Sequence, residues 1–562
     1  ITKDWSEDDK ASNLVVACLV GDWQESSQGD MQIVRDLVTG DFEVWKRDMR
    51  SILKDESSPI TLRNGHWKVK DRELLWKELS DWVFDEHLER IQKAAVQVLS
   101  EVDPRMEIAA EKRELASISG TENRFSISLR EGLSETIGFL GNRGDQMLKK
   151  CSQHKPGIVA ILAVREILSD ADYKKWGSLN YQLPLLAEAA PKEFILTVEQ
   201  ALVSHPSPFT ELFSQEGVGI FGQNYLTGLF WGLENLAWQE EWLVRVSELL
   251  AGLAEIDPGG KWSERPLNSL SKIFLPWMTQ TLASFETQLV AMRTIQKEHP
   301  KIAWKLLLSL LPSHRSHSSG SHKPKWLDLT EDQILPKITN LTYWNRVNEY
   351  AKMALEMAKD SGDTLREFII NIDKLPEKFQ DDLTEFLKSN EANKLTGEEK
   401  QEIWKSTVTL AAKHRRFFDT DWALPESRIE KLEALADNLA PKSPRGLHSR
   451  LFQQNDYDLY EESEDWEAER KKLESKRNDA VGEILQDEGL EAVLKFLEEV
   501  ESPFEVGAAL GRTSGNKIDL EILPEKLEDE PDRMTRFVSA YITTRLAKES
   551  WVWVDELDRS SW

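Results

Sequence analysis

From about Asp85 onward, apolar residues recur at every third or fourth position and almost never alternate with polar ones. The stripe in Phe285–Ile295 is followed by another in Ile302–Leu310, and His299-Pro300 separates the two. This spacing predicts successive amphipathic helices, which bury their apolar faces by stacking on one another. No fixed repeat length of 34 or 40 residues recurs. We therefore predict a mainly α chain, most of it an irregular helical-repeat array of the TPR or HEAT type.

The first 80 residues carry a different pattern. Helical spacing is expected over about 8–19, 28–37 and 42–53, and again over 72–79. Between them, Asn64-Gly65 stands in the middle of an alternating stretch, residues 60–70, and this dipeptide suits the tight turn of a β-hairpin. Helices followed by one hairpin indicate a small N-terminal winged helix. Its third helix mixes acidic and basic residues, so we expect it to face protein rather than DNA.

Four segments follow from these patterns. We assign 1–82 to the winged-helix domain, 83–312 to the first part of the array, 313–326 to a polar Ser/His loop, and 327–562 to the second part of the array. The last 112 residues hold 29 acidic and 14 basic side chains. The chain starts without Met and ends on an apolar pattern that is still running, so we expect it to be a piece of a longer protein, truncated at its end.

Charge and composition exclude several classes of binding partner and of site. The net charge of −27 repels phosphate backbones and anionic lipids, which disfavours direct nucleic-acid or membrane binding. No apolar run approaches the ~18 residues that span a bilayer. Cys18 and Cys151 are too few for a disulfide framework or a cysteine metal site. A cytoplasmic location is expected.

Two short segments resemble cofactor-binding motifs, but neither has the sequence context that such a motif requires. Residues 217–222 match G-x-G-x-x-G by letter, but they follow the polar Ser214-Gln215-Glu216 instead of a strand. Gly259-Gly260-Lys261 precedes Trp262, where a phosphate loop needs Ser or Thr. The sequence contains no nucleophile elbow and no H-E-x-x-H. We therefore expect no catalytic, cofactor-binding or metal-binding residue in this chain.

The Ser/His loop and three tryptophans are the candidates for partner contact. His314, His317 and His322 have no carboxylate or cysteine inside the loop to complete a zinc shell, so a mobile polar loop is the first interpretation and a partner-binding loop the second. Most of the 21 tryptophans are expected in the core. The predicted partner-binding residues are His314, Arg315, His317, His322, Lys323, Trp326, Trp262 and Trp422.

Five segments are informative beyond their helical pattern: Asn64-Gly65-His66-Trp67, Trp231–Trp238 (WGLENLAW), Leu253–Trp262 (LAEIDPGGKW), Ile273–Trp277 (IFLPW) and Trp304–His314 (WKLLLSLLPSH). Together they span most of 55–330. These segments resemble the C-terminal part of antiviral STAND NTPases of the Avs type, and the similarity continues to Gly511.

The resemblance implies a ligand-sensing and oligomerising module that recognises a phage protein, such as the terminase large subunit or the portal. Recognition would activate an ATPase and an N-terminal effector, often a nuclease, outside this chain. ATP and magnesium would belong to that parent protein, and self-association would give a homo-oligomer, for which a tetramer is plausible.

Two other functions remain open. The same array could serve a scaffold or adaptor protein without a defence role. An enzyme built from dispersed carboxylates would need a pocket with a strongly perturbed carboxylate, which we do not expect.

Overall fold

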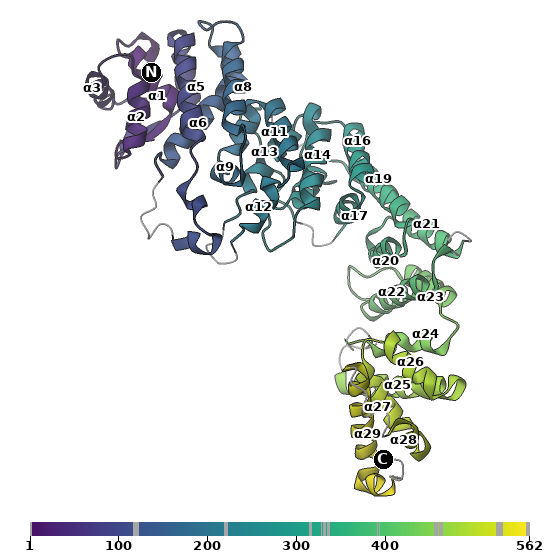
Figure 1. The fold of residues 1–562 in the computed structure, drawn as a ribbon. Coiled ribbons are helices and arrows are strands. Elements are labelled where there is room, and N and C mark those ends of the chain that lie inside the picture. Colours follow the sequence, from purple (N-terminus) through teal and green to yellow (C-terminus); the bar gives the residue numbers. More distant parts are fainter. Residues whose placement is uncertain are drawn as a thin grey trace. The chain divides into compact units, whose positions relative to one another are not determined.

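The computed structural model describes residues 3–115, 123–217, 223–313, 317–327, 329, 333, 338–389, 392, 394–454, 459, 465–523 and 532–557. The chain divides into two compact units. Unit 1 comprises Ile1–Leu310 and Ser316–Val347, and unit 2 comprises Leu311–Arg315 and Asn348–Trp562. The described residues are mainly α-helical, with one small sheet near the N-terminus (Figure 1). This confirms the predicted fold class.

The N-terminal part of unit 1 has the predicted order of elements. Its elements are α1 (Ala11–Val20), β1 (Asp22–Gln24), α2 (Gln28–Leu37), α3 (Phe42–Ile52), β2 (Ile60–Arg63), β3 (His66–Val69) and α4 (Arg72–Glu78). The predicted hairpin is β2–β3, and Asn64 and Gly65 both have the positive φ that its turn requires. A third strand was missed: β1 pairs antiparallel with β3, which gives the sheet order β1-β3-β2. Three residues are too few to show an alternating pattern.

The rest of unit 1 is the first part of the helical array. Its helices are α5 (Asp85–Leu99), α6 (Ile127–Phe139), α7 (Asp145–Met147), α8 (Lys155–Leu168), α9 (Tyr173–Ser178), α10 (Leu183–Ala189), α11 (Pro191–Val203), α12 (Pro208–Ser214), α13 (Thr227–Ala237), α14 (Glu240–Glu255), α15 (Pro266–Ile273), α16 (Phe285–Glu298) and α17 (Pro300–Ser309). Pro191 and Pro300 each occupy the first turn of a helix, as their fixed φ favours. Successive helices lie against one another, as Figure 1 shows. Buried aliphatic residues make the contacts between them.

Helix α6 joins the N-terminal elements to the array at very close range. A Cβ on Gly132 would overlap the carbonyl oxygen of Val20, so only glycine allows the end of α1 to lie directly on α6. Arg72, at the start of α4, donates to the carbonyl oxygens of Cys18 (3.1 Å) and Gly132 (2.8 Å). It thereby satisfies a free carbonyl at the end of α1 and ties α4 to α6.

Helix α19 (Asn340–Ala358) runs from unit 1 into unit 2. The other helices of unit 2 are α20 (Gly362–Ile370), α21 (Glu377–Lys388), α22 (Gly397–Arg416), α23 (Glu426–Leu439), α24 (Pro444–His448), α25 (Trp466–Glu488), α26 (Leu490–Glu499), α27 (Pro503–Thr513), α28 (Asn516–Ile522) and α29 (Asp532–Glu556). One polar cluster is buried there: Asp519 accepts from Tyr541, Arg545 and Trp553. Within the described part of the chain, none of the helices combines the length and apolar character needed to cross a bilayer.

Tryptophan burial is less complete than predicted: ten of the twenty tryptophans that the structure describes are buried, so half of them, and not most, lie in the core. Trp23, Trp76, Trp176 and Trp238 are among the largest fully buried side chains. Trp551, at 71% exposure, is an example of the opposite. The large rings fill the gaps that helices of unequal length leave between them.

Replacing Gly132 by Ala tests the close approach of α1 to α6. The added methyl group must push the Val20 carbonyl away, and we expect the stability of unit 1 to fall by about 2–3 kcal/mol. Calorimetry of the full chain measures the shift of the corresponding thermal transition.

Gly482→Ala is the matched control, because a Cβ at that position in α25 meets nothing within 4 Å. It should leave stability unchanged or raise it by up to about 1 kcal/mol. Equal melting behaviour of Gly132→Ala and the unaltered chain would contradict the packing described.

Candidate functional site: a segment held in a groove of the array

Part of the predicted Ser/His loop lies along the array instead of standing in solvent. We call Gly320–Trp326 the strap. Starting from its N-terminal end, the strap contacts Gln280, then α13, then α10, and finally α6. It therefore runs across the helices in the direction opposite to their order in the chain. The interpretation as a mobile polar loop is wrong for these residues, because they are fixed by hydrogen bonds along their length.

Glu188 on α10 binds the C-terminal end of the strap. Its side chain is only 4% exposed. One carboxylate oxygen accepts from the backbone N–H of Trp326 (2.8 Å) and the other from that of Lys325 (3.1 Å). Asn235 of α13 donates its amide to the same carboxylate (2.9 Å). Burial raises the pKa of Glu188, and the two strap N–H groups partly offset that rise.

Glu234 on α13 binds the strap in the same way, at His322. It is fully buried and accepts from the backbone N–H of His322 (2.5 Å) and from the hydroxyl of Ser269 on α15 (2.6 Å). Burial raises its pKa, and nearby Lys272 lowers it in part. Two neighbouring helices thus offer buried carboxylates to the backbone of one non-helical segment. A buried carboxylate requires such donors.

The His322 side chain is fixed by α13 on two sides. Its ring stacks on Trp231 with centroids 4.9 Å apart, and its Nδ1 lies 2.7 Å from the Oδ1 of Asn235. Since the amide nitrogen of Asn235 donates to Glu188, its Oδ1 is an acceptor and His322 must donate from Nδ1. The indole N–H of Trp238 donates to the His322 carbonyl (2.9 Å). Burial lowers the pKa of His322, and the positive charge of Lys272 lowers it further.

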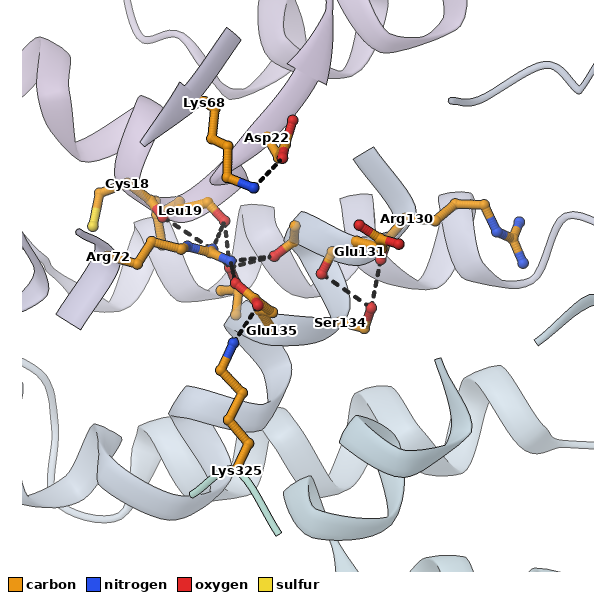
Figure 2. A network of polar contacts seen from close by, with 12 residues as sticks. Cys18, Leu19, Asp22, Lys68, Arg72, Arg130, Glu131, Ser134, Glu135 and Lys325 are labelled. Atoms are coloured by element: carbon orange, nitrogen blue, oxygen red, sulfur yellow. Dashed lines mark hydrogen bonds and ion pairs between the residues drawn. The ribbon is translucent and has the colours of Figure 1, made fainter. Parts of the chain in front are cut away.

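A row of charged side chains connects the strap to α4 through α6. Lys325 of the strap pairs with Glu135 of α6, and Arg72 of α4 donates to the same carboxylate (2.9 Å), as Figure 2 shows. Burial opposes ionisation of Glu135, but the two cations outweigh it and lower the pKa of the carboxyl group. Figure 2 also shows Arg72 reaching Cys18 and Leu19, at the end of α1.

A row of aromatic side chains runs beside the charged one. Trp76 of α4 stacks on Phe139 of α6 with centroids 4.2 Å apart, and Trp326 of the strap meets Phe139 edge-on at 5.9 Å. Gly138 leaves room for that indole, since a Cβ there would lie 2.6 Å from its Nε1. Arg72 and Trp76 lie four residues apart on α4, as do Glu135 and Phe139 on α6. The charged row and the aromatic row therefore lie side by side on the same faces of these two helices.

The predicted partner-binding residues do not form one cluster in the structure. It brings His322 and Trp326 into the strap contacts, and Lys323 lies between them with an exposed side chain. His317 is exposed, and His314 and Arg315 lie outside the described residues. Trp262 and Trp422 are half-buried and lie elsewhere, Trp422 beside His414 and Phe417 of unit 2.

The groove residues on the helices were missed. Glu188 and Glu234 stand within the apolar stretches LPLLAEAA and WGLENLAW, and a carboxylate inside an apolar stretch is a signal of a buried polar contact. Residues 218–222 of the glycine-rich motif lie outside the described residues. Among the residues that the structure describes, no group of three or more His, Cys, Asp or Glu could hold a metal ion.

One surface hollow concerns the enzyme alternative. It has a volume of about 390 Å³ and lies beside the charged row, between Lys68, Arg72, Glu131 and Trp326. Asp22, also in its lining, pairs with His66 and Lys68. The pKa values of Asp22 and Glu131 are raised, in both cases first by burial.

Comparison with known proteins adds little to the geometry. No protein-family model and no curated protein matches the sequence. Among solved structures, the chain is similar to a circular tandem repeat protein with novel repeat topology and enhanced subunit contact surfaces. The identity is 15%, the match covers 97% of this chain and 100% of that chain, and the TM-score is 0.18. A superposition this poor informs neither fold nor function.

Replacing Glu188 by Gln tests the groove. The new amide group presents hydrogens where the strap and Asn235 also present hydrogens, so at least one donor loses its acceptor. We expect trypsin to cleave after Lys325 roughly tenfold faster, which corresponds to the cost of about one buried unsatisfied donor. Limited digestion followed by mass spectrometry measures the rate. Glu199→Gln in α11, which removes a surface ion pair with Arg245, should leave it unchanged. An unaltered rate for Glu188→Gln would contradict the contacts.

Lowering the pH should release the strap through His322. The seated imidazole has a pKa below its usual 6.5, whereas a released one regains the usual value. The released form therefore takes up protons more readily, and the seated form loses stability as the pH falls below 6.5. Hydrogen exchange of peptides covering 317–327, corrected for intrinsic rates, should show a several-fold loss of protection from pH 7.5 to 5.5.

His322→Asn provides the control for this prediction. It removes the imidazole but not Glu188 and Glu234, which titrate in the same region of the groove. The pH dependence should disappear in this variant. The same loss of protection with and without the imidazole would assign the effect to the carboxylates.

Proposed function

We propose that this chain is the partner-recognition part of a larger antiviral switch protein. The partner is a phage structural or packaging protein of the terminase or portal class. Its binding activates an ATPase and an effector that lie outside the chain, and the complex assembles into a homo-oligomer. The antiviral assignment rests on the resemblance of the segments quoted above to Avs-type STAND NTPases.

The groove that holds the strap is the main support for a role in partner recognition. Side chains of α6, α10 and α13 hold a non-helical polypeptide segment through its backbone N–H groups and three of its side chains. An array with these properties is suited to binding other polypeptides. The net charge of −27 further favours a basic target, because complementary charge accelerates encounter.

A helical-repeat scaffold or adaptor without a defence role is the alternative. The two differ in what precedes the chain. A strand–loop–helix with a phosphate-binding G-x-x-x-x-G-K-[ST] upstream supports the switch, whereas the scaffold does not require one.

Binding to purified phage proteins tests the proposal directly. The 562-residue chain, mixed separately with the terminase large subunit and the portal, should co-elute with one of them on a sizing column. If charge steers the encounter, the association rate should fall from low to high salt. Elution apart from both proteins would contradict the antiviral role and favour the scaffold.

A further inference from the structure

The contacts of the strap separate into general and selective ones. The general contacts are backbone N–H groups donated to Gln280, Glu234 and Glu188, and any segment that follows the same backbone path could supply them. The selective contacts are made by the side chains of His322, Lys325 and Trp326. A sequence-selective peptide-binding site shows the same division: hydrogen bonds to the peptide backbone provide affinity, and contacts with its side chains provide specificity.

The aromatic contact selects a ring rather than a hydrogen bond. The indole N–H of Trp326 is buried and has no acceptor among the described residues. The ring itself packs against Phe139 and lies over Gly138. A Phe or Tyr side chain could therefore fill the same place, while the basic residue before it would pair with Glu135.

We infer that the groove over α6, α10 and α13 is a binding site for a segment of a partner protein, and that the strap occupies this site in cis. The partner segment carries a basic residue followed by an aromatic one, in the positions of Lys325 and Trp326. This inference rests on the proposed recognition function and names the chemistry of its ligand.

Occupation of the groove is also linked to the N-terminal elements. The Lys325 ammonium shares Glu135 with Arg72, and Trp326 shares Phe139 with Trp76. A segment that displaces the strap takes over or vacates both contacts. The environment of α4 therefore depends on whether the occupant of the groove supplies these two side chains.

A peptide copy of the strap tests the inference on the full chain. The probe is fluorescein-labelled Gly-Ser-His-Lys-Pro-Lys-Trp-Leu, the sequence of residues 320–327. It is titrated against the unaltered chain, against a variant with residues 320–326 replaced by seven Gly and Ser residues, and against Trp326→Ala. We expect anisotropy to show at least tenfold tighter binding by the replaced strap than by the unaltered chain, with Trp326→Ala between them.

Two controls define specificity. A scrambled peptide of the same composition should bind the replaced-strap chain at least tenfold more weakly. Glu188→Gln in the replaced-strap chain should weaken binding of the native peptide by about the same factor, because it removes an acceptor for the peptide backbone.

Each outcome decides the inference. Peptide binding by folded variants supports it, and lack of binding by folded variants overturns it. Loss of folded structure in both variants, seen by circular dichroism, also overturns it, because the strap would then be part of the fold and not a replaceable occupant. If the peptide binds but phage terminase and portal do not, the groove stands and the antiviral proposal fails.

Discussion

Buried carboxylates that need hydrogen-bond donors are the constraint on which the centre of unit 1 depends. Glu188 and Glu234 lie among apolar residues on two packed helices, and burial raises the pKa of both. Without donors, each would be costly in that position. The backbone of the strap supplies them, together with Asn235 and Ser269. Helices and strap therefore stabilise one another through these hydrogen bonds.

Helix α6 extends this dependence to the N-terminal elements. Glu135 and Phe139 stand one helical turn apart and contact the strap and α4 at the same time. Gly132 and Gly138 allow the close approach on which these contacts rely. The groove and the winged-helix-like part are thus joined by direct side-chain contacts, and α6 is the element through which a change at one reaches the other.

The sequence predicts local structure well here because the signals are local. Apolar stripes in single segments predict α16 and α17, and Asn64-Gly65 predicts the hairpin. The strap escapes prediction because its partners are far away in the chain: Trp326 is 138 residues from Glu188, and its donor is a backbone N–H that has no sequence signature. The one available signal was a carboxylate inside an apolar stretch. The partner's identity rests on resemblance, since no feature of the groove distinguishes a phage protein from another basic polypeptide.

Amide hydrogen exchange of the unaltered chain at neutral pH tests the central claim most directly. The account predicts that the amides of His322, Lys325 and Trp326 are protected to a degree comparable with those of α13, because each is donated to a buried carboxylate. Exchange of these three amides at the rate of a solvated loop would contradict it.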